Sequence, residues 1–311
     1  MNKLTQITVT SMLFITTNLY ASNYPEKPIE MIIPYSAGSN SDSAARILIS
    51  TMRSYLDTEL IPINSAGAGG TIGLNKLSRS KADGYTIGFS PTGPVAIQPQ
   101  IRNVPYDMSS FKTICLVVNN PVTISVSPNS EINTFNDLIN EAKNKKLVAV
   151  GGAPGSIPHV VQSYIANKYD TKFIYLPAGG GAKASKAILG GEADFVADSS
   201  SIGNLYGLKT ILTLGDERLP DYSNAPTLKE LGTDFTLSVW FGLFAPKNLP
   251  EDRTKRLSHA CEEAVNNTDF KSNMKRAGFI VSYKNSSDFR SFYEKEYVKY
   301  ESILKEINII K

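Results

Sequence analysis

The sequence predicts an α/β protein of two domains with a cleft between them. Short apolar runs alternate with segments whose apolar residues recur at helical spacing, as in mostly parallel sheets covered by helices. Several of these runs end in a loop of small residues just before the next helix. Two further apolar runs, at residues 114–127 and 239–244, are expected to be strands that cross into a second domain and return.

The first domain is expected to begin with three short strands. These strands are predicted at residues 29–34, 60–64 and 85–90, where apolar residues cluster. Apolar side chains then recur at helical spacing from Ala44 to Leu56, which predicts a helix after the first strand. A second helix, after the second strand, is predicted to end near Lys81.

The same alternation returns between the two crossings. Helices are predicted at residues 137–145, from about 159 onward and through 189, and strands at residues 147–150, 172–176 and 193–197. Two C-terminal helices, at residues 252–265 and 287–304, are expected to pack on the first domain. The first domain is therefore predicted to be discontinuous, with residues 22–121 and 242–311, and the second to be residues 122–241.

The N-terminus has the pattern of a signal peptide. Residues 1–21 contain one charge, Lys3, then a moderately apolar run, and end in Ala21 at the expected cleavage position. We therefore expect export, with the mature chain starting near Ser22, and a buried N-terminal helix is the alternative. No later segment approaches the ~20 uninterrupted apolar residues of a membrane span.

The composition limits the possible classes of partner and cofactor. Of the 311 residues, 41% are hydrophobic and 20% are charged, as in soluble proteins large enough for two cores. The formal net charge of +3 is too small to indicate a nucleic-acid or anionic-membrane partner. His159 and His259 are the only histidines, and no Cys-x-x-Cys or His-Glu-x-x-His spacing occurs, so no metal site is expected.

Residues 67–73 form a glycine-rich segment that looks like a dinucleotide-binding motif. No suitably spaced acidic residue follows it, so we interpret it as a structural loop near the cleft and expect no cofactor. The two cysteines, Cys115 in an apolar run and Cys261 in a helical segment, allow one disulfide in an oxidising compartment. Two isolated thiols that fill small core positions are the interpretation we favour.

The loop at residues 34–42 is the strongest candidate for a binding site. Its small residues leave backbone N–H groups free at the positive end of the following helix, which allows a carboxylate to bind without a cationic side chain. An ordinary turn capped by Ser39, Asn40 or Ser41 is the alternative. Comparable loops follow at residues 90–93, 151–158, 178–181 and 198–201, each at the carboxyl end of a strand, where open α/β sheets bind ligands.

The sequence offers little for catalysis. Ser156 and His159 are three residues apart and could be imagined as a nucleophile and its base. Ser156 is better placed as a helix N-cap, and it lies outside any Gly-x-Ser-x-Gly turn. An exported hydrolase that uses this pair is kept as a weaker alternative, and no enzyme is expected. Asp42, Asp194 and Asp198 are the carboxylates nearest the predicted cleft, as helix caps or as acceptors for a ligand amine.

Seven motifs occur in an order typical of one protein family. They are Tyr24-Pro25-Glu26-Lys27-Pro28-Ile29, the loop at 34–42, the glycine-rich segment 67–73, Ala82-Asp83-Gly84-Tyr85-Thr86, and residues 189–194, 225–232 and 240–246. From about Tyr24 to the C-terminus, the chain resembles the extracytoplasmic solute-binding proteins of tripartite tricarboxylate transporters, often called the Bug family. The resemblance implies a periplasmic protein with the two-domain Venus flytrap fold, similar to type II binding proteins.

The resemblance also implies a function and a site. Such a protein binds a small carboxylate or related polar solute, delivers it to membrane permease subunits and is expected to be a monomer; a ligand-dependent sensor partner is the alternative. The carboxylate is expected on backbone amides and small hydroxyls of three loops, with Asp198 nearby. The candidate ligand-binding residues are Tyr35, Ser36, Ala37, Gly38, Ser39, Asn40, Asp42, Ala68, Ser90, Thr92, Gly155, Ser156, His159, Gly179 and Asp198.

Two loops depart from what is common in the family. Ser39-Asn40-Ser41 stands where glycines and threonine are common, which adds hydrogen-bonding side chains to the first loop. Ala178-Gly179-Gly180 stands where Tyr-Lys-Gly is common, which is expected to enlarge or soften that wall of the cleft. The identity of the solute therefore does not follow from better-known relatives.

Overall fold

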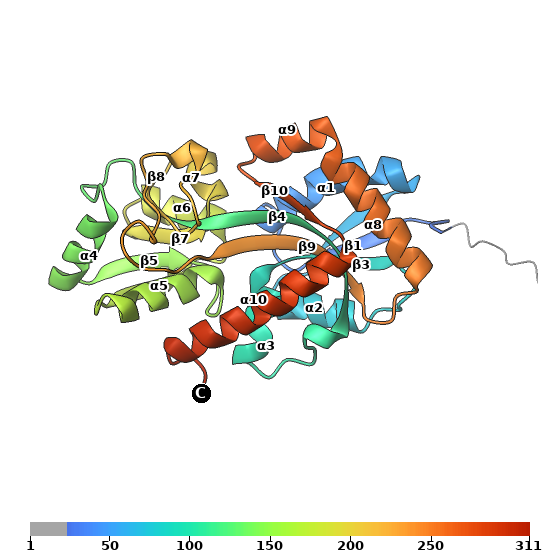
Figure 1. Cartoon of the computed structure of the whole chain (residues 1–311), viewed down its shortest axis with the longest axis horizontal. Coiled ribbons are helices and arrows are strands. Elements are labelled where there is room, and N and C mark those ends of the chain that lie inside the picture. The colour runs from blue at the N-terminus through green and yellow to red at the C-terminus, as the bar shows by residue number, and fades with distance from the viewer. Residues whose placement is uncertain (1–23) are drawn as a thin grey trace, which may run out of the picture.

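The computed structural model describes residues 24–311, so the predicted signal peptide at residues 1–21 lies outside the described part of the chain. Figure 1 shows two lobes joined by the long strands β4 (Phe111–Val126) and β9 (Ser238–Pro246). Lobe 1 holds strands β1 to β3, and lobe 2 holds strands β5 to β8. Within residues 24–311, no helix combines the length and apolar character that crossing a membrane requires.

The strands form one continuous, mixed sheet in the order β2-β1-β3-β9-β4-β7-β5-β6, with β8 and β10 also paired to β4. The remaining strands are β1 (Ile29–Ile33), β2 (Leu60–Asn64), β3 (Thr86–Pro91), β5 (Leu147–Gly151), β6 (Phe173–Pro177), β7 (Phe195–Ser199), β8 (Lys209–Thr213) and β10 (Val281–Lys284). The six short strands predicted outside the crossings are thus confirmed to within two residues, the first crossing strand begins three residues earlier than predicted, and β8 and β10 were not predicted.

The prediction of mostly parallel sheets is wrong at the centre of the molecule. The outer pairs β1–β2, β1–β3, β5–β6 and β5–β7 are parallel. The central strands β4 and β9 pair antiparallel with each other, and their pairs with β3, β7, β8 and β10 are antiparallel too. The reason is topological, because one crossing strand leaves lobe 1 and the other returns to it.

Helices cover the sheet of each lobe (Figure 1). They are α1 (Asn40–Leu56), α2 (Thr71–Ser78), α3 (Gln98–Ile101), α4 (Phe135–Asn144), α5 (Ile157–Lys168), α6 (Gly181–Leu189), α7 (Ser201–Tyr206), α8 (Glu251–Asn266), α9 (Thr268–Arg276) and α10 (Ser286–Glu306). Short helical turns lie at Ala68–Gly70, Gly93–Ile97, Met108–Ser110 and Pro220–Tyr222.

The helices that sequence analysis missed have weak apolar patterns. In α9 only Phe270 and Met274 are buried, so the sequence shows too few apolar residues at helical spacing to predict a helix. The helix is instead started by Asn267, whose side chain accepts hydrogen bonds from the N–H groups of Asp269 and Phe270. The long helices α8 and α10 were predicted to within two residues because each has a sustained buried stripe.

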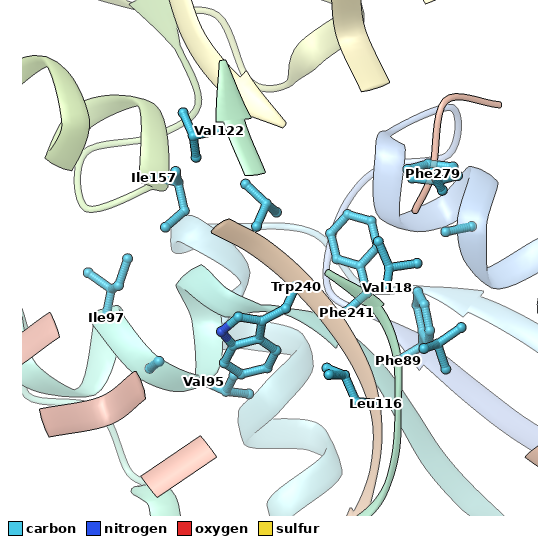
Figure 2. Close-up of a cluster of buried hydrophobic side chains, with 14 of the residues drawn as sticks. Phe89, Val95, Ile97, Leu116, Val118, Val122, Ile157, Trp240, Phe241 and Phe279 are labelled. Carbon is cyan, nitrogen blue, oxygen red and sulfur yellow. The ribbon is translucent and has the colours of Figure 1, made fainter. Parts of the chain in front are cut away.

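Aromatic side chains fill the core where the crossing strands meet lobe 1. Figure 2 shows Phe241 of β9 near Phe89 of β3 and Phe279, with Trp240 on the opposite side of the strand. The indole N–H of Trp240 is fully buried and donates to a carboxylate oxygen of Glu296 at 3.2 Å. Because buried polar groups are costly without a partner, this pair holds α10 against β9.

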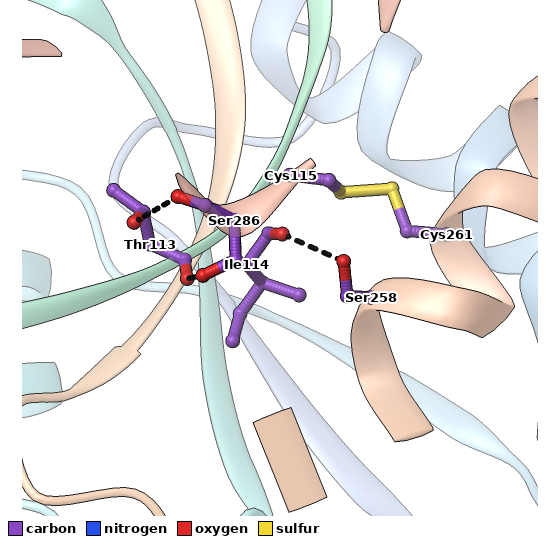
Figure 3. Close-up of a disulfide and its surroundings, with 6 residues drawn as sticks. All are labelled: Thr113, Ile114, Cys115, Ser258, Cys261 and Ser286. Atoms are coloured by element: carbon purple, nitrogen blue, oxygen red, sulfur yellow. Dashed lines mark hydrogen bonds between the residues drawn. A yellow bond between two sulfur atoms is a disulfide. The ribbon is translucent and has the colours of Figure 1, made fainter. Parts of the chain in front are cut away.

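The two cysteines form a disulfide, which corrects the interpretation of two isolated thiols. Figure 3 shows Cys115 of β4 joined to Cys261 of α8, with Cα atoms 6.7 Å apart. Both residues are fully buried. Helix α8 lies on β4, and Ser258, one turn before Cys261, donates to the carbonyl oxygen of Ile114 at 3.2 Å. The proximity arises from packing between segments 146 residues apart, which no local pattern reveals.

Candidate functional site

A cavity of about 450 Å³ lies between the lobes, at the carboxyl ends of β1, β3, β5, β6 and β7. This volume suits a small molecule. Lobe 1 contributes Tyr35, Ser36, Ser39, Asn40, Ser41, Ala66, Gly67, Ala68, Gly69, Gly70, Pro91 and Gly93. Lobe 2 contributes Gly152, Ala153, Ser156, Ile157, Pro158, Gly179, Gly180, Gly181 and Asp198, and β9 adds Val239 and Phe241.

Three helices begin at the cavity wall. The first residues of α1, α5 and α6 are Asn40, Ile157 and Gly181, and all three line the cavity. A helix N-terminus presents free backbone N–H groups and the positive end of the helix dipole. The three helix starts therefore make the cavity attractive to an anion.

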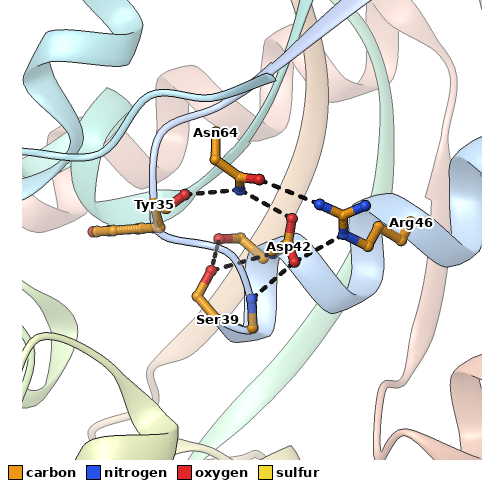
Figure 4. A network of polar contacts seen from close by, with 7 residues as sticks. Tyr35, Ser39, Asp42, Arg46 and Asn64 are labelled. Carbon is orange, nitrogen blue, oxygen red and sulfur yellow. Dashed lines mark hydrogen bonds and ion pairs between the residues drawn. The ribbon is translucent and has the colours of Figure 1, made fainter. Parts of the chain in front are cut away.

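The first loop is held by a network of polar side chains (Figure 4). Ser39 is the N-cap of α1, and its hydroxyl accepts from the Asp42 N–H at 3.3 Å. The buried Asp42 carboxylate in turn accepts from the Gly38 N–H and from Arg46 Nε, each at 2.9 Å. Asn64 of β2 donates to both Asp42 and the Tyr35 carbonyl oxygen at 2.9 Å, which ties the loop to the neighbouring strand.

Asp42 is fixed in its charged form by this network. Burial opposes ionisation, but hydrogen bonds from Arg46, the Gly38 N–H and Asn64 hold the pKa of Asp42 below its ordinary value. Its carboxylate is occupied by these partners and lies outside the cavity lining. In this structure Asp42 therefore stabilises the conformation of the loop and does not itself line the cavity.

The loop after β5 contacts lobe 1 directly. The carbonyl oxygen of Pro154 accepts from Gln98 Nε2 and from Arg102, each at 3.2 Å. Gly155 has φ +81°, and a Cβ there would lie 2.1 Å from Ile101 Cδ1. The glycine at this position is needed for the close approach of the lobes.

The loop after β6 lines the cavity with glycines only. Gly179 and Gly180 have φ values of +78° and +145°, which favour glycine, and a Cβ at either position would meet nothing within 4 Å. The following residue, Gly181, approaches lobe 1, where a Cβ would lie 3.3 Å from Asn40 Nδ2. This wall therefore carries no polar side chain where it faces the cavity.

Asp198, the second-last residue of β7, lines the cavity and is its acidic residue. One carboxylate oxygen accepts from the N–H of Ser199 at 2.7 Å. Burial raises the pKa of Asp198 to about 6, and the Ser199 hydrogen bond opposes this shift. Within residues 24–311, the lining residues include no lysine, arginine or histidine.

Ser156 and His159 have separate partners. Ser156 occupies the N-cap position of α5, as predicted, but makes no capping bond; its hydroxyl lies 3.3 Å from the Tyr175 hydroxyl. His159 Nδ1 accepts from the Gly155 N–H at 3.3 Å, and its ring packs edge-on against Tyr175 with centroids 4.9 Å apart. Burial lowers the pKa of His159. Ser156 and His159 are therefore not hydrogen-bonded to each other, as the hydrolase alternative would require.

The structure brings together about half of the residues predicted to bind ligand. Tyr35, Ser36, Ser39, Asn40, Ala68, Ser156, Gly179 and Asp198 line the cavity. Ala37, Gly38, Asp42, Ser90, Thr92, Gly155 and His159 lie outside its lining. Which of the lining residues contact a solute stays a prediction.

The hydroxyl groups of Ser90 and Thr92, at the end of β3, bind other parts of the protein and not the cavity. Ser90 donates to the Pro91 carbonyl oxygen at 3.0 Å. The Thr92 hydroxyl accepts from the Trp240 N–H at 3.0 Å and so joins β3 to β9. Asp194 likewise has a structural partner, because its carboxylate accepts from the Val148 N–H at 2.7 Å. Of residues 90–93, only Pro91 and Gly93 line the cavity.

Sequence analysis missed the apolar part of the lining. Val239 and Phe241 belong to the predicted return crossing, whereas Ile157 and Pro158 were predicted in the loop at 151–158 and are the first residues of α5. Their position in or next to predicted cleft segments was the available signal. In the described part of the chain, no group of three or more histidine, cysteine, aspartate or glutamate side chains is arranged to hold a metal ion.

Comparison with known proteins places the chain in a family. Residues 44–309 match the sequence profile of the tripartite tricarboxylate transporter family receptors. Protein BugT of Bordetella pertussis is 28% identical over 264 residues, which cover 81% of this chain and 80% of BugT.

Solved structures show the same fold. The periplasmic binding protein BugD superposes with a TM-score of 0.85 at 25% identity, covering 92% of this chain and 99% of BugD. MatC of Rhodopseudomonas palustris, solved with bound malate, superposes with a TM-score of 0.83 at 20% identity, covering 90% of this chain and 100% of MatC. The chain therefore belongs to the tripartite tricarboxylate transporter family of receptors, the two-domain solute-binding proteins also called Bug proteins.

Proposed function

We propose that this protein captures a small organic acid between its lobes, outside the cytoplasm, and delivers it to a membrane permease of the tripartite tricarboxylate type. The observation that carries the proposal is the convergence of the N-termini of α1, α5 and α6 on one cavity. Together they offer a carboxylate several backbone N–H donors in a partly desolvated space. The hydroxyls of Ser36, Ser39 and Ser156 add donors beside them.

The cavity size and the family both support a small solute. A volume of about 450 Å³ is at the lower end of typical ligand pockets. MatC, which has the same fold, holds malate, and we extend only the class of small carboxylate to this chain. The protein itself supplies binding and no catalytic step, because a receptor transfers its solute unchanged.

Capture is proposed to proceed by closure of two domains. We propose domain limits at residues 22–121 with 242–311 and at 122–241. A change in strand pairing supports the first limit, because Pro121 still pairs with Ser238 of β9 while Val122 pairs with Ser199 of β7. On β9 the pairing with lobe 1 already begins at Ser238, a few residues before the proposed return. Contacts such as Gln98 to Pro154 would form and break as the lobes move.

Export and assembly complete the proposal. Family members are periplasmic binding proteins, and we propose that this chain is exported too, with cleavage near Ala21. We further propose that it works as a monomer whose closed form is recognised by the permease subunits. Uptake assays in cells with and without the permease, using the solute identified below, test the delivery step: uptake that persists without the permease contradicts it.

The first experiment is a thermal-shift screen of the refolded, ligand-stripped chain from Ser22 against mono-, di- and tricarboxylates, amino acids and aromatic acids. A ligand at ~100 times its dissociation constant is expected to add about 2.7 kcal/mol of stability. The matched variant is Asn40→Asp, which places a negative charge at the start of α1, where a helix tolerates it but an anionic solute does not.

The control for that variant is Asn136→Asp, the same substitution in the first turn of α4, an exposed site away from the cavity. We expect Asn40→Asp to lose the ligand shift and Asn136→Asp to keep it. A screen in which no anion stabilises the protein, or in which both variants behave alike, contradicts carboxylate capture in this cavity.

A further inference from the structure

We propose that the solute carries an ammonium group as well as its carboxylate, as amino acids do, and that Asp198 binds this group. The inference rests on the proposed function and names the class of solute for the same cavity. Its basis is the distribution of charge around the cavity. Among residues 24–311, Asp198 is the only acidic side chain in the lining, and the lining contains no basic side chain.

The carboxylate of Asp198 has spare hydrogen-bonding capacity at the cavity. The Ser199 N–H binds one of its oxygens, Oδ1. The backbone of Asp198 pairs with Thr123 of β4, so the residue is held in place near the end of a central strand. A carboxylate accepts several hydrogen bonds when charged, and its second oxygen makes no hydrogen bond with any of the described residues.

The titratable neighbours of Asp198 are two tyrosines, and both use their hydroxyl hydrogens elsewhere. Tyr35, from the loop after β1, directs its hydroxyl to the Gly69 carbonyl oxygen at 3.5 Å. Tyr175, from β6, donates to the Gly152 carbonyl oxygen at 2.9 Å. Burial raises the pKa of both phenols, so they stay neutral and provide no countercharge.

Cationic side chains near the cavity are also occupied. Arg46 binds Asp42 and Asn64 behind the first loop. Arg102 binds the Pro154 carbonyl oxygen on the outside of the lobe contact. Neither lines the cavity, so the half-buried Asp198 carboxylate faces no cationic side chain among the described residues that line it. An ammonium group of the solute would supply the missing positive charge and would favour the charged form of Asp198 further.

The cavity therefore has two complementary ends. The helix starts of α1, α5 and α6 favour a negative group, and Asp198 favours a positive one. A plain dicarboxylate would place its second negative charge in a space where the only fixed charge is also negative. A solute with a carboxylate and an ammonium group matches both ends, and a hydroxy acid, which offers a neutral donor to Asp198, would rank between the two.

The test uses solutes matched in length, measured by isothermal titration calorimetry at pH 8. The four-carbon series is succinate, malate and aspartate, and the five-carbon series is glutarate, 2-hydroxyglutarate and glutamate; butyrate and 4-aminobutyrate give a single-carboxylate pair. In the series that binds, we expect the ammonium compound to bind at least tenfold more tightly than the plain acid. A plain acid that binds as tightly as its ammonium counterpart overturns the proposal.

The variant Asp198→Asn tests whether Asp198 is the residue that binds the ammonium group. This variant keeps the size of the side chain and removes its charge, so the ammonium compound is expected to lose at least tenfold in affinity while the plain acid does not. Asp216→Asn, at an exposed position of lobe 2, is the matched control and is expected to change neither. Equal losses for ammonium compound and plain acid in Asp198→Asn would overturn the assignment.

The pH dependence of the unaltered protein provides a second measurement that needs no variant. Because Asp198 takes up a proton near pH 6, affinity for the ammonium compound is expected to fall between pH 8 and pH 5, whereas affinity for a plain acid is expected to rise. A flat profile for both contradicts the proposal. If no compound of any type binds, the proposed function fails as well, and the two failures are thus distinguishable.

Discussion

The two walls of the cavity are built by different means. In lobe 1, the loop between β1 and α1 is held by side chains: Ser39 caps the helix, and Asp42 collects hydrogen bonds from Gly38, Arg46 and Asn64. In lobe 2, the loop between β6 and α6 has glycines at residues 179–181 and no side-chain hydrogen bond to the cavity. The disulfide is also confined to lobe 1, where it joins β4 to α8.

This difference indicates distinct roles in binding. A loop fixed by a buried carboxylate keeps its N–H groups in place before a ligand arrives, which reduces the entropy lost on binding. Glycines have more conformational freedom, so the opposite wall can adjust its backbone to the solute as the lobes close. Lobe 1 thus offers a preformed anchor and lobe 2 an adaptable cover, and the following changes test this contrast.

The largest effect is expected from removing the disulfide. Cys115→Ala with Cys261→Ala should lower the free energy of unfolding by about 4 kcal/mol, because the bond closes a long loop in the unfolded chain. Urea denaturation measures the loss. Hydrogen exchange should show faster opening of α1 and α8 in lobe 1 than of α4 and α5 in lobe 2. A uniform increase in both lobes would contradict the view that lobe 1 alone depends on the bond.

Removing the buried carboxylate of the first loop is expected to be next. Asp42→Ala should cost about 2 kcal/mol, because the Gly38 N–H and Asn64 lose a charged acceptor. Asp137 of α4 has a similar role at an exposed capping box, so Asp137→Ala is the matched comparison and should cost less. Equal losses measured by denaturation would show that burial of Asp42 contributes nothing.

The Asp42 contribution should also depend on pH. Its pKa is lowered in the folded protein, so its stabilisation is present above the ordinary aspartate pKa of about 4 and is lost as the pH falls through the lowered value. The difference in stability between the unaltered protein and Asp42→Asn should therefore shrink below about pH 4. Denaturation curves between pH 7 and pH 3 measure this, and a constant difference would argue against a charged Asp42.

A pair of glycine variants compares the two walls of the cavity with only a small loss of stability. Gly38 and Gly179 have nearly equal φ values of +79° and +78°, and a Cβ at either would meet nothing within 4 Å. Alanine at each should lower stability by about 1 kcal/mol through backbone strain alone. Only Gly179 lines the cavity, so only Gly179→Ala is expected to alter ligand affinity. Loss of binding in Gly38→Ala alone would place the adaptable wall in lobe 1.

The smallest effect is expected at the exposed contact between the lobes. Arg102→Ala removes one hydrogen bond to the Pro154 carbonyl oxygen and should change stability by less than about 0.5 kcal/mol. Gln98 keeps its own bond to the same oxygen, so ligand affinity should change less than threefold. A tenfold loss of affinity would show that closure of lobe 2 depends on this surface contact.

Much of the fold was predictable because its causes are local. The buried stripe of α1 from Ala44 to Leu56 and the apolar run of β1 decide their own structure, and most elements were predicted within two residues. Short elements with few apolar residues, such as α9 and β10, were missed because packing and a cap at Asn267 define them. The candidate loops were found because small residues between a strand and a helix are visible in sequence.

The sequence by itself determined the alternation of strands and helices, the polar loops at the strand ends and the resemblance to the receptor family. Only the tertiary structure decided that Cys115 meets Cys261, that the central strands run antiparallel, and that Asp198 faces the cavity while Asp42 and Thr92 face away. The physical reason is that backbone conformation follows short-range periodicity, whereas the direction of each loop side chain depends on partners distant in sequence. Asn64 and Trp240 are such partners, 22 and 148 residues from the side chains they bind.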